Sequence, residues 1–484
     1  MSQTSGINNY WLSGYQGGIS GGGGQMTLNF DTLPLFIHRT PRKMNFDATN
    51  ASISDRRGNL LFYSNGGWIA NSIHDSLSNG RLPYGTYNHR YYGEQVPQES
   101  LFLESPGDTN IYFMFYNLVE VMPAGYVASK YLYYLRIDKR PNNGLGAVIQ
   151  KNISAINDTL IVGEITSCKH GNGRDWWVIC HRIQSNLFYK VLLTPQGVSS
   201  PTTQYIGDTM QFVQAIGQAV FSPDGTKYAS YHAKHNDNDL LILDFDRCSG
   251  TFSNPIHITI DDSASAGGVA FSPNSQLIYV SSINYVYQFD VAAANIPLSK
   301  RKIATYDGYY SPQPPFSSNF FLAQLAPDGK IYINSANTVV DLHVINQPDS
   351  LGLACDLVQH SFHLPALNAF TIPNHPNYFL RADSGSVCDT LMLGLPNFFL
   401  NKEKLSIDLY PNPSNDKLIV SYQPIDTPQT LEVVDISGKT VLKSNVPQWS
   451  QYQNLDISKL FEGVYLCRLV CRDKIVSAKF VISR

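Results

Sequence analysis

The chain carries little charge for its length. Charged residues make up 15% of its 484 residues, against roughly 25% in an average soluble protein. The formal net charge is −3, and the lysines and arginines form no run. Because binding to nucleic acid needs a basic face, the sequence excludes nucleic acid as a partner. No apolar run approaches the roughly 18 residues of a membrane helix, so no transmembrane segment is expected.

Motifs for common chemistry are also missing. The sequence contains no G-x-S-x-G elbow, no H-E-x-x-H pair and no P-loop. None of the seven cysteines stands in a C-x-x-C pair, so we expect no structural zinc. We therefore predict no catalytic residue, no metal and no cofactor. The first residues have neither a basic stretch nor an apolar run. This indicates either a natural start upstream with a signal peptide, which we favour, or a mature form behind an added Met.

Cysteine spacing leaves the disulfides open. Cys168 and Cys180 flank a polar turn and can face each other across a hairpin. Cys248 and Cys355 follow comparable strands and pair only if the fold brings them together.

What the chain does have is a repeated unit over its first 380 residues. A tight polar turn precedes a strongly apolar run at 54–66, 105–116, 169–181, 221–232, 271–282 and 325–335. The last three turns contain Pro223, Pro273 and Pro327, spaced by about 50 residues. A fixed period of that size, filled with short strands, is typical of a β-propeller. The six turns predict at least six blades, and the leftover strands at both ends favour seven over six.

The turn itself has a physical basis. In Ser222-Pro223-Asp224-Gly225, proline fixes φ, aspartate caps the turn and glycine supplies the left-handed conformation. The second such turn ends in Ser275 in place of glycine. We expect the strand at 24–31 to pair into the last blade and close the ring.

The last eighty residues form a second pattern. Four segments from Leu405 onward alternate apolar and polar residues and end in turns, which predicts a small immunoglobulin-like β-sandwich. The fold class is therefore all-β, with a propeller over 1–381, a linker over 382–404 and the sandwich over 405–484.

The order of these C-terminal segments resembles the type A C-terminal sorting domain of the type IX secretion system of Bacteroidetes. The first part of the chain resembles the lactonase-like or WD-repeat-like propellers that accompany such tails. The resemblance implies export to the cell surface or the exterior, with the translocon and its sorting machinery as partners. It also implies that the tail is commonly removed. The residues that it assigns to the sorting signal are Pro411, Asn412, Pro413, Gly438, Gly463, Tyr465 and Lys479.

Three further groups of residues are candidates for function. Residues 231–239 place two histidines and two aspartates in one polar loop, which can hold a metal or form a solvated hairpin tip. His74, His170 and His181 lie beside turns, where they can act as acid–base groups or bond backbone carbonyls. Two tyrosine-rich loops, 84–92 and 306–310, can stack on sugars, contact a protein partner or pack between blades.

These observations favour a secreted or cell-surface binding and adhesion module, with a glycan, a peptide or another surface protein as ligand. The alternative is an enzyme, a lactonase-like hydrolase or a lyase, that works in the central channel. Histidines and carboxylates meeting at one end of the channel would favour the enzyme. A channel lined by serine, threonine and apolar residues would favour the binding module.

Overall fold

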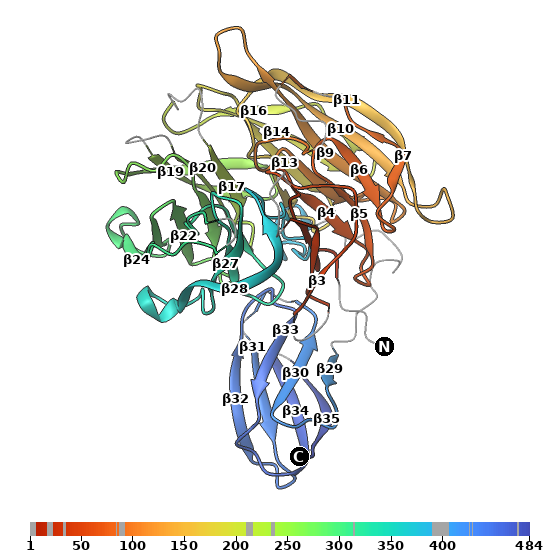
Figure 1. The fold of residues 1–484 in the computed structure, drawn as a ribbon, viewed down its shortest axis with the longest axis vertical. Helices are drawn as coiled ribbons and strands as arrows, with labels where there is room; N and C mark the ends of the chain where they lie inside the picture. Colours follow the sequence, from red (N-terminus) through yellow and green to blue (C-terminus); the bar gives the residue numbers. More distant parts are fainter. Residues whose placement is uncertain are drawn as a thin grey trace.

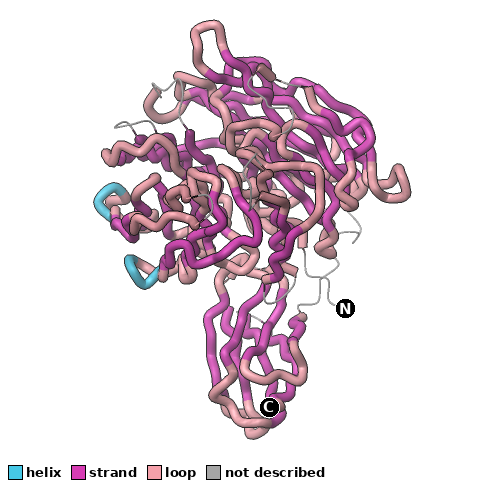
Figure 2. The backbone as a smooth tube through the Cα atoms, viewed as in Figure 1, coloured by secondary structure: helices cyan, strands magenta, loops and turns pink. Residues whose placement is uncertain are grey.

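The computed structural model describes residues 6–16, 23–31, 35–83, 85–86, 92–209, 216–233, 238–312, 315–389, 406–424, 426–427, 429–471 and 474–484. Over these residues the protein is built from strands and loops (Figures 1 and 2). The helical elements in them are two short 3-10 turns, η1 (Pro297–Ser299) and η2 (Gly352–Cys355). A helix that could cross a bilayer is absent from the described part of the chain.

One sheet pattern recurs, in which four consecutive strands pair in chain order. Three sheets have this form: β17–β20, β21–β24 and β25–β28. Their strands are β17 (Ile216–Phe221), β18 (Lys227–Ala233), β19 (Asn238–Asp246), β20 (Thr251–Ile260), β21 (Gly268–Phe271), β22 (Leu277–Ser282), β23 (Tyr285–Asp290), β24 (Arg301–Thr305), β25 (Ala323–Leu325), β26 (Ile331–Ile333), β27 (Val339–Ile345) and β28 (Leu357–Asn368).

The preceding sheets repeat this pattern with small variations. One pairs β12 (Thr166–Lys169), β13 (Trp176–His181), β14 (Leu187–Thr194) and β15 (Gly197–Val198), with β16 (Thr202–Tyr205) also on β14. Two further four-strand sets join through a parallel contact between β7 and β11. They comprise β4 (Ala51–Ser54), β5 (Leu60–Ser64), β6 (Trp68–Asn71), β7 (Ser76–Arg81), β8 (Ser100–Glu104), β9 (Ile111–Val121), β10 (Val127–Asp138) and β11 (Ala147–Leu160).

The first strands of neighbouring sheets contact one another, from β4 to β8, from β12 to β17, from β17 to β21 and from β21 to β25. Short antiparallel sheets that meet along their first strands form a β-propeller. The predicted turns lie where the repeat requires them. Each joins the first strand of a sheet to the second, as at 222–226 between β17 and β18. Three of the second strands, β13, β22 and β26, are buried along their whole length.

The N-terminal strands do not pair into the last sheet, so that expectation is wrong. Strands β1 (Tyr10–Ser13), β2 (Met26–Asn29) and β3 (Phe36–Arg39) form a sheet of their own. The segment 357–368 already supplies the outer strand of the last sheet. The ring is instead joined by packing, because Trp11 and Leu28 share an apolar cluster with Phe321 and Leu364.

After β28 the chain continues along the inner strands of several sheets. Asn374 donates to the carbonyls of Ser100 and Ile165, 3.1 and 2.9 Å away. Asn377 donates to the carbonyl of Pro223, and Gln324 donates to the carbonyl of His375. Because these partners belong to four different sheets, the residues from 371 to 379 run through the centre of the propeller.

A disulfide holds the segment that follows. Cys248 is bonded to Cys388, with 5.6 Å between their Cα atoms. The two pairings considered from the sequence are therefore wrong, because Cys168, Cys180 and Cys355 are free and buried. In the strand register Cys168 lies opposite Trp177 and not opposite Cys180. The limits predicted for the linker stay a prediction, although residues up to Cys388 are tied to the propeller.

The C-terminal strands form two sheets, β29-β30-β33 and β32-β31-β34-β35. Their bounds are β29 (Ile407–Tyr410), β30 (Lys417–Tyr422), β31 (Gln429–Val434), β32 (Thr440–Val446), β33 (Tyr452–Asp456), β34 (Gly463–Cys471) and β35 (Lys474–Ile482). Leu418, Leu431, Val433, Leu469 and Phe480 are buried between them. This sandwich projects from one side of the propeller, with the C-terminus at its far end (Figure 1).

Candidate functional site

The centre of the propeller is filled by the protein itself. Besides the segment 371–379, two glutamine side chains bridge inner strands. Gln98 pairs with both backbone groups of Ala219, at 2.8 and 3.0 Å. Gln218 accepts from Val269 and Ala323 and donates to the carbonyl of Ala323 at 2.7 Å. These bonds connect segments of different sheets across the centre.

His375 lies in this central segment. Its Nε2 atom lies 3.0 Å from the hydroxyl and 3.1 Å from the carbonyl of Ser52. The side chain is buried. Burial lowers the pKa of His375 to about 4, so the ring is neutral at neutral pH.

One end of the centre contains a cavity of about 80 Å³. It lies beside the turns that join the first and second strands, and Phe221, Pro223, Phe271, Pro327 and Phe379 contribute to its wall. Thr166 and Ser167 also line it. Asn374, His375 and Asn377 of the central segment line it as well, so the wall combines apolar and polar side chains.

Acidic residues gather near the centre, at the starts of inner strands. Glu99 precedes β8 and Glu164 precedes β12. The Glu99 carboxyl accepts from the Gly163 N–H at 2.5 Å. Glu164 and His232 form a buried ion pair, 2.7 Å between Oε1 and Nε2, with side-chain exposures of 3% and 0%. Of this cluster the sequence singles out only His232, within the loop 231–239, because Glu99 and Glu164 are scattered singly and belong to no motif.

The charge states in this cluster differ. Burial, reinforced by the carboxylate of Glu94, raises the pKa of Glu99 well above its usual value. Burial opposes a charge on His232, but the Glu164 carboxylate outweighs it and raises the pKa of His232. Burial and neighbouring carboxylates thus favour the neutral form of Glu99, whereas the contact with Glu164 favours the charged form of His232. Within the described residues no group of three or more His, Cys, Asp or Glu side chains is arranged to hold a metal.

The three histidines singled out from the sequence lie apart. His74 Nδ1 lies 3.1 Å from the Tyr63 hydroxyl, beside a pocket of about 290 Å³ that His38 also lines. Burial lowers the pKa of His181 to about 3, and its ring packs on Phe188 with centroids 4.6 Å apart. His170 and His181 lie at opposite ends of the hairpin that β13 shares with β12.

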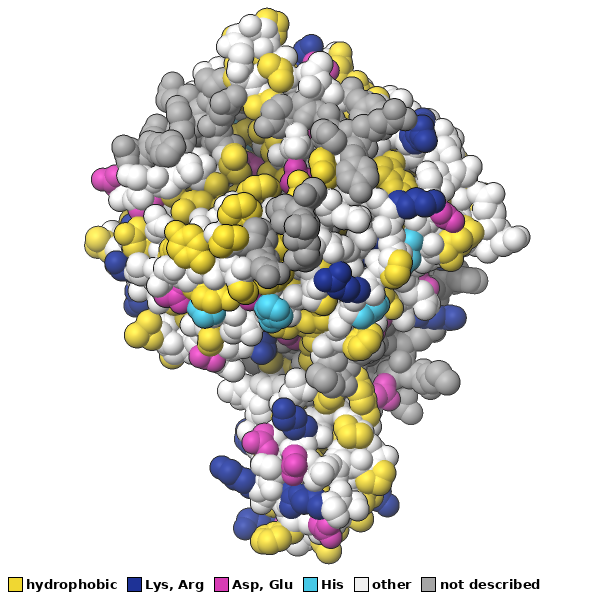
Figure 3. Space-filling model, viewed as in Figure 1, with side chains coloured by type: hydrophobic (Ala, Val, Ile, Leu, Met, Phe, Trp, Pro, Cys, Tyr) yellow, Lys and Arg dark blue, Asp and Glu magenta, His cyan; other side chains and the backbone are white. Residues whose placement is uncertain are grey.

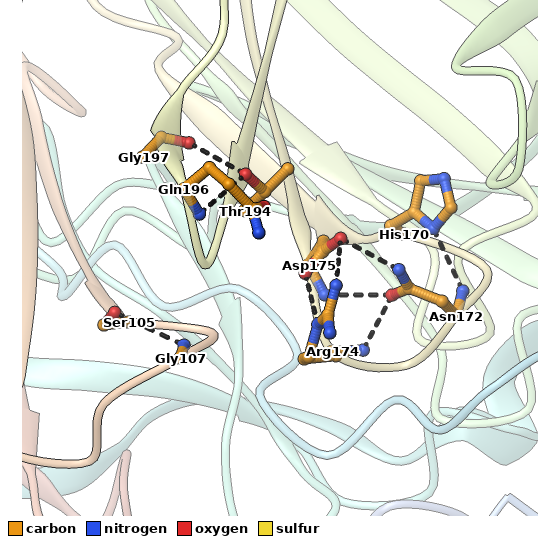
Figure 4. A network of polar contacts seen from close by, with 9 residues as sticks. All are labelled: Ser105, Gly107, His170, Asn172, Arg174, Asp175, Thr194, Gln196 and Gly197. Carbon is orange, nitrogen blue, oxygen red and sulfur yellow. Dashed lines mark hydrogen bonds and ion pairs between the residues drawn. The ribbon is translucent and has the colours of Figure 1, made fainter. Parts of the chain in front are cut away.

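His170 belongs to a polar turn that Figure 4 shows from close by. Its Nδ1 accepts from the Asn172 N–H at 3.0 Å, and its Nε2 lies 2.9 Å from the carbonyl of Cys248. Arg174 and Asn172 both bond the carboxylate of Asp175, at 2.7 and 2.9 Å. Both ring nitrogens of His170 therefore contact backbone groups, as a structural histidine does.

Only part of the loop 231–239 belongs to the described residues. Residues 234–237 lie outside the described part, and with them His235 and Asp237. Of the others, His232 pairs with Glu164, and Asp239 lies 3.0 Å from His257 Nδ1. The structure does not bring the described members together as a ligand set.

One of the two tyrosine-rich loops gives an exposed aromatic surface, the Tyr310 surface, defined by Tyr309, Tyr310, Phe316 and His360. The rings of Tyr309 and His360 stack with centroids 4.0 Å apart. Tyr310 is 61% exposed and Phe316 is 43% exposed. Asp307 bonds His360 Nε2 at 2.9 Å. In the other loop, Tyr84 and residues 87–91 lie outside the described part, and Tyr92 stacks on Tyr15.

The residues of the predicted sorting signal lie mostly at the end of the sandwich far from the propeller. Residues 411–413 are exposed, and the peptide bonds before both prolines are cis. Asn412 donates to the carbonyl of Lys479 and accepts from the N–H of Val481, at 3.2 and 3.0 Å. Gly438 turns the chain between β31 and β32 with φ +86°. Gly463 opens β34 opposite Ile482.

Tyr465 also lies at the end of the sandwich far from the propeller. The Tyr465 hydroxyl donates to the carbonyl of Phe461 at 2.9 Å, and its ring stacks on Phe480. Around them two large apolar side chains are almost fully exposed, Ile436 at 89% and Phe461 at 85%. Sequence reasoning did not single these two out, because an apolar residue next to a turn looks like part of a core.

The opposite end of the sandwich contacts the propeller. The Gln451 N–H donates to the carbonyl of Pro327 at 2.8 Å, and the Gln451 side chain donates to Asn8 at 3.1 Å. Trp449 lines the central cavity and Tyr452 packs with Tyr332 in the propeller core.

Comparisons with solved structures list several proteins of similar outline. A protein from Lactobacillus plantarum is 14% identical with a TM-score of 0.43, over 75% of this chain and 98% of its own. A 6-phosphogluconolactonase candidate from Bacteroides uniformis is 12% identical with a TM-score of 0.38, over 93% and 100%. The Dos1 propeller is 9% identical with a TM-score of 0.36, over 76% and 87%. Because these scores are low, the propeller assignment rests on the sheets described above.

No curated protein matches the chain. One family model does match, over residues 408–483, and it describes the secretion system C-terminal sorting domain. This agrees with the sandwich, with its turns at 411–413 and 435–439, and with the resemblance drawn from the sequence. The chain is therefore a β-propeller protein whose residues 408–483 form a secretion-system sorting domain, and such a domain implies export across the outer membrane by the type IX system.

Proposed function

We propose that the exported propeller is a glycan-binding adhesion module with seven blades, and that it binds through the Tyr310 surface. The observation that carries the proposal is the contrast between a filled centre and an exposed aromatic surface. A stacked ring pair beside an open tyrosine offers flat faces to the apolar side of a sugar. Asp307 and Gln359, both next to His360 and hydrogen-bonded to the same loop, add acceptors and donors for hydroxyl groups.

The low charge of the chain favours a neutral ligand. Charged residues make up 15% of the sequence, and on the face of the molecule seen in Figure 3 the Lys and Arg side chains are scattered singly. A neutral saccharide makes its contacts through stacking and hydrogen bonds, which such a surface supplies.

A glycan array with the full chain tests the proposal. Tyr310→Ala should lower the affinity for the bound glycans about two- to twelvefold, because a stacking contact of one aromatic ring is worth roughly 0.5–1.5 kcal/mol. The matched control is Tyr205→Ala, since Tyr205 is exposed to 68% on a different sheet. An array without any bound glycan, or equal losses in both variants, would overturn the proposal.

A second candidate is the hydrolase or lyase of the lactonase type. The observation in its favour is the cluster of Glu99, Glu164 and His232, in which two buried carboxyl groups lie beside a histidine and burial raises the pKa of Glu99. Such an arrangement can supply both a general acid and a general base. If lactones or acidic saccharides are turned over by the protein and Glu99→Gln abolishes turnover, this candidate replaces the first.

For the sorting domain we propose that the machinery recognises its far end. The predicted signal residues shape or border that end: Pro411, Asn412, Pro413, Gly438, Gly463, Tyr465 and Lys479. Ile436 and Phe461 supply exposed apolar contacts there. Apolar side chains at the centre of a surface patch are the usual anchors of a protein interface.

A further inference from the structure

The pocket of about 290 Å³ lies between the N-terminal sheet and the first strands of the propeller. In the N-terminal sheet Leu12 pairs with Thr27, and Thr27 pairs with His38. Residues paired across neighbouring strands point to the same face of a sheet, and all three line the pocket. Trp11 and Leu28 point to the opposite face and pack in the propeller core. The sheet therefore has one face for the core and one for the pocket.

The other wall comes from the sheet that begins with β4. Asn59 lines the pocket just before β5, and Ser72 and His74 line it in the turn after β6. The two walls are joined beside the pocket, because the Ser52 hydroxyl of β4 donates to the carbonyl of Tyr10 at 2.9 Å. The pocket is thus a gap between two bonded sheets.

The turn 71–75 holds a histidine at this gap. Asn71 Oδ1 accepts from the N–H groups of Ile73 and Asp75, both at 3.1 Å, and the His74 N–H donates to the Asn71 carbonyl at 3.0 Å. In this turn His74 has a left-handed backbone, at φ +67°. Residues with a side chain adopt that conformation rarely, and such residues cluster at binding sites. The turn therefore fixes the imidazole at the wall of the pocket.

The wall is rich in groups that both donate and accept hydrogen bonds. The hydroxyls of Thr27 and Thr40 lie 2.7 Å apart, and Ser72 adds a third hydroxyl. His74 Nδ1 lies 3.1 Å from the Tyr63 hydroxyl, which leaves Nε2 for a ligand. The hydroxyls of a sugar also donate and accept at the same time, so they match this lining.

The charge around the pocket favours a neutral ligand. The described residues that line it include no acid, lysine or arginine. Burial and the guanidinium of Arg42 lower the pKa of His74, so its ring is mostly neutral at neutral pH. Beside it, Asp75 pairs with Lys43 at 3.4 Å, and the two charges offset each other.

An exposed aromatic ring borders the same wall. Phe36 is 52% exposed, and its ring stacks on that of His38 with centroids 4.8 Å apart. Such a flat apolar face can contact the C–H side of a sugar ring. The volume lies near the lower end of the range for small-molecule sites, about 300–1,000 Å³. The pocket therefore has room for one sugar ring.

We propose that this pocket binds a single neutral sugar unit. His74 and the hydroxyls of Thr27 and Thr40 supply hydrogen bonds, and Phe36 supplies a stacking face. The site is separate from the Tyr310 surface and does not rest on that proposal, so either one can fail without the other.

Titration of the full chain with the methyl glycosides of glucose, galactose and mannose, followed by saturation-transfer NMR, tests this site. At least one glycoside should bind in a saturable manner. His74→Asn removes the imidazole and keeps a residue type that tolerates the left-handed backbone. It should weaken binding about tenfold, the effect of one lost hydrogen bond. Ser72→Phe fills the pocket from an exposed turn position and should abolish binding.

The matched control is Ser200→Phe, since Ser200 is exposed in the loop between β15 and β16. This variant should bind the glycoside like the wild type. Tyr310→Ala separates the two sites, because binding that is lost there and kept in His74→Asn belongs to the Tyr310 surface. That result, equal losses in both phenylalanine variants, or a wild type that binds none of the three glycosides would each refute the sugar pocket.

Discussion

Single residues show how closely the propeller depends on its buried polar groups. His375 is neutral because it is buried, while in the unfolded chain its pKa is near the ordinary value of 6.5. Below that pH the unfolded state takes up a proton that the folded state refuses until about pH 4. The contribution of His375 to stability is therefore complete above pH 6.5 and is lost as the pH falls toward 4.

The expected size follows from the two pKa values. Between pH 7.5 and pH 5, His375 should remove about 2 kcal/mol from the free energy of unfolding. His375→Gln keeps a donor for the Ser52 carbonyl and cannot be protonated, so its loss over this range should be smaller by that amount. Denaturant unfolding of both proteins at the two pH values measures the difference. Equal losses would show that His375 is already charged in the folded protein.

At the scale of elements, the turns between the first and second strands were predictable from their glycines. One turn has serine in place of glycine and needs a separate explanation. The turn at Gly225 has φ +73°, and Gly329 has φ +77°, as the sequence indicated. Ser275 takes the same left-handed conformation, at φ +61°, although it has a side chain. Its hydroxyl accepts from the Asp224 N–H of the neighbouring sheet at 3.1 Å. A bond between sheets therefore offsets the backbone cost of a non-glycine residue.

Two variants separate these effects. Ser275→Ala keeps the backbone cost and loses the bond, and should lower the free energy of unfolding by about 1 kcal/mol. Ser275→Gly loses the bond but relieves a left-handed conformation that costs roughly 1 kcal/mol, so it should stay close to the wild type. Chemical denaturation ranks the three proteins. An alanine variant as stable as the wild type would show that the hydroxyl contributes nothing.

Local sequence patterns predicted the strands and turns. The buried polar cluster, the disulfide and the contact between the domains depend on long-range contacts that no local pattern shows. Pro223 and Gly225 set a turn through their own backbones, so the sequence alone was enough for them. Glu99 and Glu164 meet only because two inner strands start side by side. Cys388 was assigned to a linker, so its bond to Cys248 was missed. From the sequence Trp449 is expected to pack in the sandwich, because its contact with the propeller depends on how the two domains lie together.

At the scale of the whole molecule, the two domains have separate tasks. The sorting domain presents its far end outward, so its deletion should remove export and leave the propeller's sheets intact. Removing residues 405–484 should trap the protein in the periplasm, as fractionation and surface labelling would show. Normal surface appearance of that deletion would contradict the assignment of the domain.

A finer prediction concerns the exposed apolar residues of that end. The double variant Ile436→Lys with Phe461→Asp should reduce the surface fraction several-fold, because it removes apolar anchors from an interface. Leu298→Lys is the matched control, since Leu298 is 83% exposed on the propeller. Both variants should fold like the wild type. Surface labelling of whole cells then compares the fraction of each protein that reaches the cell surface. An unchanged surface fraction in the double variant would place recognition elsewhere on the sandwich.

The bond between Cys248 and Cys388 also determines how the molecule carries a mechanical load. Tension applied to the C-terminal domain enters the propeller at Cys388 and passes through the covalent bond to Cys248, between β19 and β20. The central segment 371–379 lies before this point in the chain and is shielded from the pull. A protein drawn through a membrane by its tail, or held by it in flowing fluid, would thus keep its centre in place.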